Sequence, residues 1–422
     1  MSVSTRRQET ASLPLRRPRI FYGWYVAMAL AFLTSATQAG TYTFGLALQP
    51  ISLQFGLDRA QLALAITMYT FLAGLLQPIS GYLADRFGSR QLGVTGAVVL
   101  GLALLSLSYA RSLPAIYLTY GVLGGLGASM MAGGVSAKII SAWFVERRGT
   151  AMSLAGASAI IAQIAVVPLA TVLLGATNWQ TADRFVALLI VLVIAPMGWW
   201  LIRNTPSEKG TYPDGNAESA ARVASESGAG LTFRQAIRQP AFWQLTAGLF
   251  TCGVTMSFPS SHLMAYAGDM GMSDMTASET IGLAGLLSLP GALALGFLGD
   301  RSSRTKMLAV AYLLRSITYL VLLQAHNPTI MLAAGVSLGL SWGATVPLTS
   351  AIVADLFGCK AIATIVTTMT MVMFMASGTF SYLAGLDFTV FGNYSAALIS
   401  AAVLGAIACV CCFTIRERSL AS

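Results

Sequence analysis

The sequence predicts an all-α membrane protein in which twelve transmembrane helices form two pseudo-symmetric six-helix bundles. Hydrophobic residues make up 56% of the 422 residues and charged residues only 10%, whereas a soluble domain carries about 25% charged residues. The mean hydropathy of +0.71 requires lipid as the solvent for much of this apolar surface. In addition, the charged hairpin GYLADRFGSR at 81–90 has a near copy, GFLGDRSSR, at 296–304.

Twelve apolar windows of roughly 18 to 26 residues have the length of membrane-spanning helices. The first is too long for a cleaved signal peptide and is followed by further windows of the same kind. In chain order they lie at 22–47, 60–82, 91–110, 115–139, 149–174, 184–202, 241–265, 277–298, 306–324, 329–353, 361–385 and 394–415.

The longest polar stretch, at 203–230, divides these windows into six and six. It is rich in Ser, Ala, Gly and Glu, a composition typical of a flexible linker. A short amphipathic helix is expected just after it, at 231–243. The expected parts are a cytoplasmic N-terminal segment (1–20), an N-terminal six-helix bundle (21–202), a cytoplasmic linker (203–240), a C-terminal six-helix bundle (241–415) and a cytoplasmic tail (416–422).

The positive charges orient the chain. Of 25 Lys and Arg residues, only Arg59, Arg111 and Arg184 fall in loops on one side, Arg315 lies inside a span, and the other 21 fall on the opposite side. Because Lys and Arg are retained in the cytoplasm, both termini and the linker are expected there, in a multi-pass protein of the cell inner (plasma) membrane. A net charge of +9 in such short loops favours lipid head groups, and not a nucleic acid, as the partner.

A second echo supports an internal repeat. The segment 121–144 resembles 335–358, at nearly the spacing of the two hairpins. Each half of the chain would then be one copy of the same bundle. Two such halves can rock about a site near the membrane midplane, which is the geometry of alternating access.

The hairpins carry chemistry suited to a contact between the halves. Gly81 and Gly296 let helices approach closely, and Gly88 can take a left-handed turn. Asp85 and Asp300 can cap a helix N-terminus or pair with Arg. Cationic residues hold both loops on the cytoplasmic side, namely Arg86, Arg90, Arg301 and Arg304. The alternative is that both are plain charged loops.

At these residues the chain resembles the major facilitator superfamily, whose signature joins the second and third helices. The resemblance covers the whole membrane part of the chain. It implies the major facilitator fold, with a central cavity between two six-helix halves, and secondary transport or facilitated diffusion without ATP hydrolysis. It also implies that Gly81, Asp85, Arg86, Gly88 and Arg90 form a gating loop.

A narrower resemblance concerns FYGWYVAMALAF in the first span and WFVERRGTAMSLAGASA at 143–159. Both are similar to the monocarboxylate and oxalate/formate transporter branch, which implies a small organic anion as cargo, often with a proton. That branch commonly holds an Arg in the eighth helix for the substrate carboxylate. Here the corresponding stretch, LSLPGALALGF, has Ala292 and no Arg, and Gly121 stands where the wider superfamily often has a buried Arg.

Two residues with chemical potential lie within the spans. Arg315 is expected about 14 Å deep at 1.5 Å per residue, where it needs a partner or a wet cavity. It is either an anion receptor or a structural Arg bonded to carbonyls. His262 lies near the outer end of the seventh span, and Pro259 frees nearby carbonyls. It either carries a coupled proton or bonds cargo, or is a hydrogen-bonded side chain at the rim.

Further polar and aromatic residues in the expected cavity helices offer stacking faces and hydrogen bonds. They are Gln38, Tyr42, Tyr69, Tyr120, Gln163, Trp342 and Thr345. For any one of them, packing between helices is the competing role. No metal-ligand cluster, phosphate-binding loop or nucleophile–base set occurs in the sequence, so we expect neither an enzyme nor a cofactor.

Two kinds of cargo remain open. The expected function is a monomeric secondary transporter of a small organic solute, a carboxylate or related anion, with a coupled proton as an option. The alternative cargo is a larger neutral or aromatic solute, such as an aromatic metabolite or a riboflavin-like heterocyclic vitamin. An intramembrane enzyme and a sensor that moves no cargo are weaker hypotheses.

Overall fold

The computed structural model describes residues 21–57, 59–219 and 230–415, with the backbone alone at 59, 60, 159, 163, 164, 167, 171 and 274. Each predicted span coincides with one helix or a consecutive run of helices. The N-terminal half contains α1 (Tyr22–Phe55), α2 (Arg59–Leu75), α3 (Gln77–Phe87), α4 (Ser89–Leu107), α5 (Leu113–Ile116), η1 (Tyr117–Gly124), α6 (Gly125–Met130), α7 (Gly133–Trp143), α8 (Arg148–Ala155), α9 (Ser158–Ile161), η2 (Ala162–Val166), α10 (Val167–Ala176), α11 (Trp179–Leu189), η3 (Ile190–Ile194) and α12 (Ala195–Leu201). The C-terminal half contains α14 (Phe233–Ala236), α15 (Pro240–Ser261), α16 (Leu263–Asp269), α17 (Asp274–Arg301), α18 (Arg304–Leu322), α19 (Pro328–Trp342), α20 (Thr345–Phe357), α21 (Ile362–Phe391) and α22 (Ser395–Phe413).

Eight helices of the described chain are long and apolar enough to cross a membrane, and a ninth span is the pair α2 and α3, bent by 46°. The other three predicted spans are α1, the run from α8 to α10, and α15 with α16. Polar residues such as Thr34, Gln38 and Thr41 lower the hydropathy of α1. The polar content of this helix already marks it as one that does not face lipid alone.

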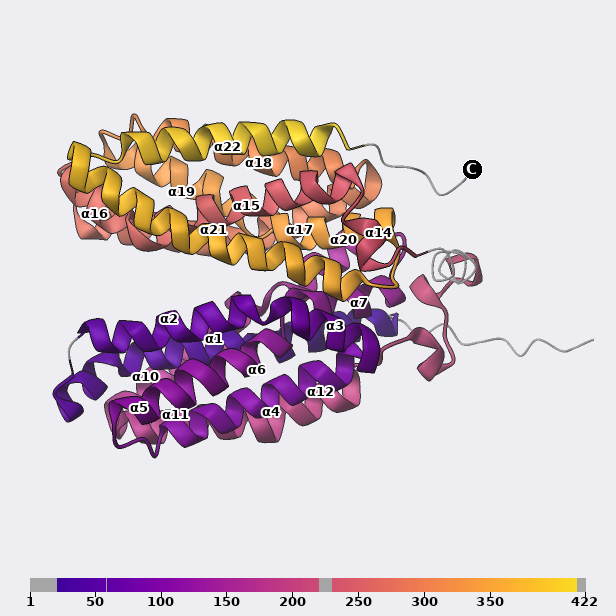
Figure 1. Cartoon of the computed structure of the whole chain (residues 1–422), viewed down its shortest axis with the longest axis horizontal. Coiled ribbons are helices and arrows are strands. Elements are labelled where there is room, and N and C mark those ends of the chain that lie inside the picture. Colours follow the sequence, from indigo (N-terminus) through magenta and orange to yellow (C-terminus); the bar gives the residue numbers. More distant parts are fainter. Residues whose placement is uncertain (1–20, 58, 220–229, 416–422) are drawn as a thin grey trace, which may run out of the picture.

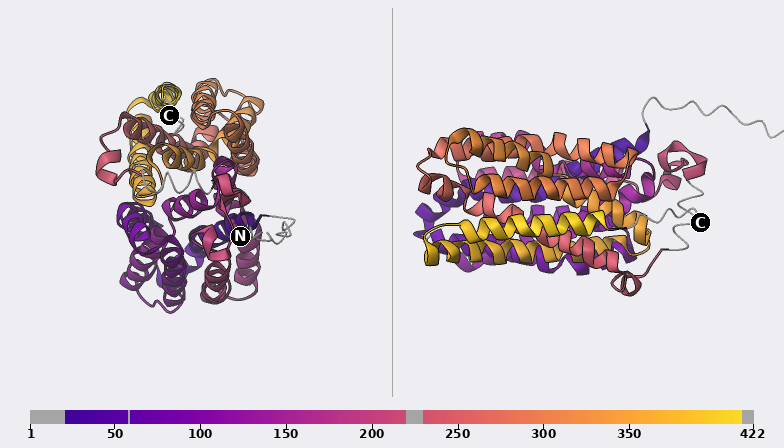
Figure 2. Two further views of the ribbon diagram at one scale, coloured as in Figure 1. Left: turned by 90° about the vertical axis from the view of Figure 1, so that its right-hand side faces the viewer. Right: turned by 90° about the horizontal axis from the view of Figure 1, so that it is seen from above.

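The helices gather into two bundles that follow the order of the chain (Figure 1). Elements α1 to α12 form one bundle and α14 to α22 the other, and the view along their length shows one stacked on the other (Figure 2). The bundles touch where α3 and α7 meet α21, and where α8 meets α17 and α20. This contact lies at the end of the molecule that carries residues 203–219, which we call the linker end, and the helices diverge toward the other end (Figure 1).

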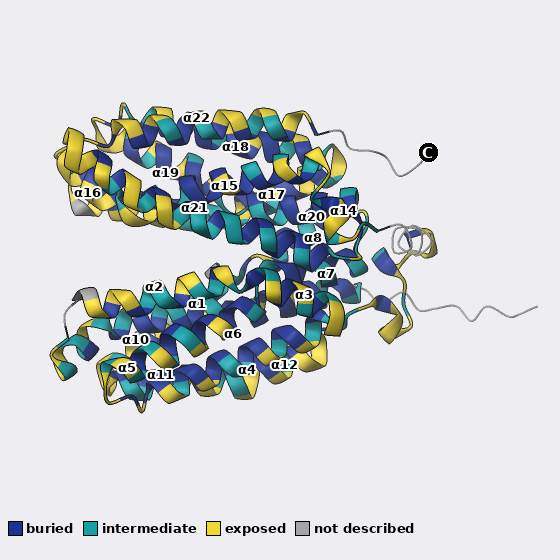
Figure 3. Cartoon of the chain, in the orientation of Figure 1, coloured by how far each residue is buried: buried dark blue, intermediate teal, exposed yellow. Residues whose placement is uncertain are grey.

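Exposed residues lie on the outward faces of both bundles (Figure 3), and many of them are large and apolar. Trp200 is 74% exposed, Leu286 70%, Phe413 66% and Leu192 65%. Exposed apolar surface of this extent is costly in water and favourable in lipid. The sides of the bundles are therefore the surfaces that contact the hydrocarbon region.

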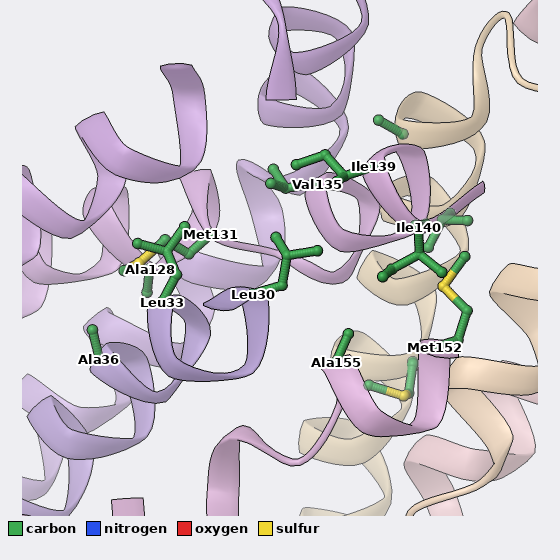
Figure 4. Packing of buried hydrophobic residues seen from close by; sticks show 14 of the residues in the cluster. Leu30, Leu33, Ala36, Ala128, Met131, Val135, Ile139, Ile140, Met152 and Ala155 are labelled. Atoms are coloured by element: carbon green, nitrogen blue, oxygen red, sulfur yellow. The ribbon is translucent and has the colours of Figure 1, made fainter. Parts of the chain in front are cut away.

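Inside the bundles, the core is made of interlocking aliphatic side chains (Figure 4). Leu30 and Leu33 of α1 are buried in the same cluster as Val135 of α7. Between helices, small residues replace the hydrophobic effect as the source of close packing. A Cβ on Gly127 would lie 2.6 Å from the backbone nitrogen of Leu100, so α6 and α4 are in backbone contact.

The first part of the linker is folded, which corrects the expectation of a flexible segment. Trp143 donates through Nε1 to the carbonyl of Arg203 at 2.9 Å. Thr205 begins a short 3₁₀ turn closed by a capping box with Glu208. The Asp214 carboxylate accepts from the backbone amides of Val145 (2.8 Å) and Glu146 (3.0 Å). Capping and these long-range bonds, invisible in the composition, hold 203–219 on the N-terminal bundle.

The expected start of the sixth span is also corrected. The predicted window begins at 184, but α11 begins at Trp179 with Asn178 as its N-cap, whose side chain accepts from the amide of Thr181. The polar residues at 180–184 lower the hydropathy without ending the helix, because the cap determines where it starts. Asp183 therefore lies inside the span and is fully buried.

Candidate functional site

A cavity of about 410 Å³ lies between the two bundles. Its walls come from α1, α2, α3, α6, α7, α8 and α9 on one side and from α20 and α21 on the other. Residues with polar side chains line much of it, namely Thr34, Thr37, Gln38, Thr41, Tyr69, Thr70, Gln77, Ser136, Ser158, Ser350 and Thr370. Among the described residues, no charged side chain lines it.

The hydroxyl groups of this wall present lone pairs to the cavity. Thr34, Thr37, Thr41, Thr70, Ser350 and Thr370 each donate their hydroxyl hydrogen to a backbone carbonyl of their own helix. A hydroxyl that has given its hydrogen away retains only acceptor capacity. The side-chain oxygen of Gln77, also buried, has no hydrogen-bond partner among the described residues. The lining is therefore rich in acceptors.

Two of the predicted site residues, Gln38 and Tyr69, line the cavity. Tyr120 stacks between Tyr69 (centroids 5.0 Å apart) and Phe44 (3.8 Å), and is itself fully buried behind them. Tyr42, Trp342 and Thr345 do not line the cavity, and the side chain of Gln163 lies outside the described residues. Helix rotation decides this, because a span of uniform hydropathy does not reveal which face points inward.

Arg315 does not reach the cavity, because it is 1% exposed and both terminal nitrogens of its guanidinium group are bonded within the C-terminal bundle. Its Nη1 donates to Thr255 Oγ1 (2.8 Å), and its Nη2 donates to the carbonyls of Ser341 (3.2 Å) and Trp342 (3.1 Å) and to Thr345 Oγ1 (3.2 Å). Helix α19 ends at Trp342, where the last carbonyls lack intrahelical partners. Arg315 therefore bonds the carbonyls at the break between α19 and α20. This geometry matches the second of its two predicted roles, a structural Arg bonded to carbonyls.

His262 lies at the far end of the C-terminal bundle, where α15 gives way to α16. Its Nε2 is 2.8 Å from the carbonyl oxygen of Ser381, and its ring lies against Phe258 and Tyr394. This is the hydrogen-bonded rim position, outside the cavity lining. A role for His262 with a proton or with cargo remains a prediction.

The two hairpin aspartates cap helices of the opposite bundle at the linker end. Asp85 accepts from the backbone amide (2.9 Å) and hydroxyl (2.7 Å) of Thr364 in the first turn of α21. Asp300 accepts from the amides of Gly149 and Thr150 in the first turn of α8, and from the Thr150 hydroxyl, each at 2.8 Å. A carboxylate at a helix N-terminus satisfies orphan amides and the helix dipole. The predicted caps are present in both copies of the repeat, while their gating role remains a prediction.

Ion pairs join the same contact. Arg148 of the N-terminal bundle lies 2.6 Å from one oxygen of Asp355, and Arg304 lies 2.5 Å from the other. Arg304 also pairs with Asp300 at 2.9 Å and donates to the carbonyls of Val145 and Glu146. Asp214 binds the amides of the same two residues, Val145 and Glu146. This loop is therefore bonded both to the linker and to the C-terminal bundle. We call the caps and these pairs the linker-end latch.

The remaining hairpin cations lie outside the latch. Arg86 and Arg301 lie over the rings of Phe87 and Phe297, their neighbours on the same helices. Arg90 donates to the carbonyl of Trp199 and stacks on its ring, which ties α4 to α12 within one bundle.

The hairpin glycines allow the latch to close. A Cβ on Gly81 would lie 2.7 Å from the carbonyl oxygen of Ala363, and one on Gly296 would lie 2.7 Å from that of Gly149. The predicted close approach is therefore present in both copies and is backbone to backbone across the halves. Gly88 has a φ of 101°, and residues with a Cβ avoid such positive φ values.

Replacing Gly296 with Val is expected to prevent closure at the linker end, because the neighbouring backbone of α8 cannot yield. The matched control is Gly282→Val in the same helix, where a Cβ meets nothing within 4 Å. Cross-linking of a cysteine pair placed across α8 and α17 measures closure. A large loss of cross-link in the Gly296 variant and none in the control is expected, and equal cross-linking would contradict this packing.

Several residues of the cavity and the latch were not predicted from the sequence. Thr34, Thr37 and Thr41 recur at helical spacing along α1, and this polar stripe in an apolar span was the signal that could have identified the cavity wall. Asp355 and Arg148 could not be found in this way, because their pairing joins residues 207 apart in the chain.

Comparisons with known proteins agree with this architecture. The model of the Major Facilitator Superfamily matches residues 28–297 and 280–422. The chain is 24% identical over 339 residues to the uncharacterized MFS-type transporter YcxA of Bacillus subtilis (79% of this chain, 80% of that protein) and 26% identical over 383 residues to monocarboxylate transporter 13 of Bos taurus (90% and 86%). It is 21% identical over 338 residues to the oxalate:formate antiporter of Oxalobacter formigenes (79% and 78%).

A solved structure supports the fold. The proton:xylose symporter XylE has a TM-score of 0.72 at 14% identity, covering 92% of this chain and 94% of its own. The resemblance seen in the hairpins and the flanking spans is confirmed by the matches along the whole chain. With two bundles around one cavity and a latch built from both copies of the repeat, the chain belongs to the Major Facilitator Superfamily.

Proposed function

We propose that this transporter moves a small, uncharged organic solute that carries N–H or O–H donors, by alternating access through the cavity between the bundles. The supporting observation is the acceptor-rich, uncharged lining. Six hydroxyls have already donated to backbone carbonyls, and the Gln77 oxygen is buried without a hydrogen-bond partner in the described part of the chain. Buried acceptors left unpaired are costly, so a solute that supplies hydrogens is favoured over one that supplies only lone pairs.

Apolar groups complete the fit to an aromatic or heterocyclic solute. Tyr69, Met131, Met152, Met373 and Phe374 line the same cavity. An aromatic face and adaptable thioethers suit a flat ring whose edge bears polar groups. Pockets for small molecules combine an apolar wall with a few fixed polar groups in this way.

A carboxylate is the second candidate, favoured by two observations. The relatives include proteins named for monocarboxylates and for oxalate and formate. In addition, the broken fourth span places the start of α7, at Gly133, in the cavity wall. Half-helix N-termini at the midplane can hold an anion without a cationic side chain.

The working cycle follows from the linker-end latch. In the structure the latch is closed, so passage to the linker end requires that its caps and ion pairs break. We place this end in the cytoplasm, in an inner (plasma) membrane, because the Lys and Arg residues concentrate there and retained positive charge marks the cytoplasmic side. Arg111 and Arg184 lie together at the opposite end, beside Gln54 and Asn178. We propose a monomer as the functional unit.

Matched solute pairs test the cargo. Primary amides and their parent carboxylates, such as benzamide with benzoate and nicotinamide with nicotinate, differ mainly in donors and charge. Counterflow in proteoliposomes and thermal shift of the purified protein report transport and binding. Exchange of the amides alone supports the proposal, exchange of the carboxylates alone establishes the second candidate, and no exchange by either set contradicts both.

Replacing Gln77 with Met, which keeps the length of the side chain, should weaken binding of an accepted donor solute about tenfold. One hydrogen bond in a desolvated site contributes about 1.4 kcal/mol, and the apolar substitute offers none. The control is Gln324→Met, at an exposed position far from the cavity. An unchanged dissociation constant in the Gln77 variant would remove this residue from the binding site.

A further inference from the structure

Asp183 is a buried acid without a partner. It lies on α11 in the N-terminal bundle, is 0% exposed, and neither carboxyl oxygen has a hydrogen-bond partner among the described residues. It lines a narrow crevice between α1, α10 and α11, together with Thr43, Ala47, Leu174 and Trp179, with no room for a water-sized sphere. Asp183 belongs neither to the linker-end latch nor to the lining of the central cavity.

The surroundings of Asp183 do not compensate a negative charge. Among the described residues, the crevice walls from α1 and α10 present no acidic or basic side chain. Arg184, the next residue, turns away and donates to Ser108 on the far side of α11, with its guanidinium over the Tyr109 ring. An isolated carboxylate in an apolar site is very unfavourable, so the closed crevice accommodates Asp183 as the neutral acid.

A second buried titratable group, Tyr120 of the fourth span, stacks on Phe44 of α1, the neighbour of the crevice residue Thr43. Its side chain is fully buried. The Tyr120 ring stacks on Tyr69, which lines the central cavity. The central cavity and the crevice around Asp183 also share α1, with Thr41 lining the cavity and Thr43 lining the crevice.

The helices around Asp183 are irregular. Tyr120 lies in the π-helical segment η1, the segment η2 leads directly into α10, and η3 follows α11. In the C-terminal bundle, the described helices contain no π-helical segment. Such segments are inserted turns that occur often at functional sites.

We propose that Asp183 is the proton-binding site that couples solute movement to a proton gradient. This inference rests on the proposed transport function and names its coupling ion. When the crevice is open, hydronium gives a proton to a carboxylate oxygen of Asp183: an O–H bond of hydronium breaks, the carboxyl O–H bond forms, and water remains. The carboxyl O–H bond is kept while the crevice is closed as in the structure. When the π-helical segments shift and readmit water, that O–H bond breaks, and the proton passes to a water molecule, which leaves as hydronium.

The Asp183→Asn variant tests this, because it is isosteric with the neutral acid and cannot release a proton. Proteoliposomes that are acidic outside and alkaline inside measure accumulation, and counterflow without a gradient measures exchange. Wild type should accumulate solute several-fold, whereas the variant should exchange solute but fall to an accumulation ratio of about one. Its exchange rate should also lose its dependence on pH. The control, Asp269→Asn, removes an exposed acid at the same end and should behave as wild type.

Each alternative outcome is decisive. If the variant accumulates solute to the wild-type ratio, Asp183 is not the coupling site. If wild type exchanges solute but never accumulates it with the proton gradient, the inference fails while the proposed function stands. If the variant does not fold, the test uses the wild-type protein treated with a hydrophobic carbodiimide. This reagent reacts with protonated carboxyl groups in apolar sites. A carbodiimide adduct on Asp183 whose yield changes when solute binds supports the proposal. The absence of an adduct on Asp183 overturns it.

Discussion

Replacing Asp300 with Asn should lower transport at least tenfold and shift the protein away from the closed linker end. Asp300 is 6% exposed and accepts from the Gly149 and Thr150 amides and the Thr150 hydroxyl, besides pairing with Arg304. Asn keeps one acceptor and turns an NH₂ group toward donors, which leaves the Arg304 charge underpaired. Breaking a buried charged pair costs about 3 to 5 kcal/mol.

A cost of that size moves a conformational equilibrium roughly a hundredfold or more. Transport requires both conformations, so a large bias toward either one slows the cycle. Asp85→Asn should act in the same direction, because Asp85 makes the equivalent cap on α21. Glu279→Gln is the control, since it makes the same change in α17 at an exposed position near the other end. Counterflow measures the transport rate, and cysteine cross-linking at the linker end measures closure. Wild-type values of both for Asp300→Asn would show that the latch does not control the transport cycle.

Replacing Arg315 with Gln is expected to destabilise the fold strongly without changing which solutes are carried. Arg315 is 1% exposed and donates to Thr255, Thr345 and the two carbonyls that end α19. Gln is too short to bridge these groups, so several buried acceptors lose their donors at about 1 to 3 kcal/mol each. The melting temperature should fall by several degrees.

The control for Arg315 is Arg301→Gln, which removes an Arg that lies over the ring of Phe297 outside the latch. The Arg315 variant that does fold should bind amides and carboxylates in the wild-type ratio. An anion receptor at Arg315 predicts the reverse result, an unchanged melting temperature with selective loss of carboxylate binding. Thermal unfolding and solute dissociation constants, measured on the same preparations, separate the two roles.

The fold was largely predictable because the signals are local or repeated. Apolar windows report the spans, and the two hairpins report the halves. The same hairpins predicted the caps, since a carboxylate after a span end can reach a neighbouring helix start. The partners Thr150 and Thr364 were not predictable from the hairpins themselves, because each lies in the opposite half of the chain.

Asp183 and Arg315 show where sequence reasoning stopped. The window that began at 184 excluded Asp183 from the membrane, because a run of polar residues resembles a loop until a cap such as Asn178 reveals a helix. Arg315 was correctly placed inside a span, but its depth alone fitted both a receptor and a structural anchor.

Local sequence patterns were enough to predict the membrane class, the order of the spans, the internal repeat and the aspartate caps, because hydropathy and turn chemistry act over short stretches. Contacts in three dimensions were needed to show that Thr41 and Gln77 face a cavity, that Arg315 binds a helix end, and that Asp183 is buried with no hydrogen-bond partner among the described residues. These depend on how each helix is rotated and where it breaks, which contacts between distant segments select and local composition does not encode.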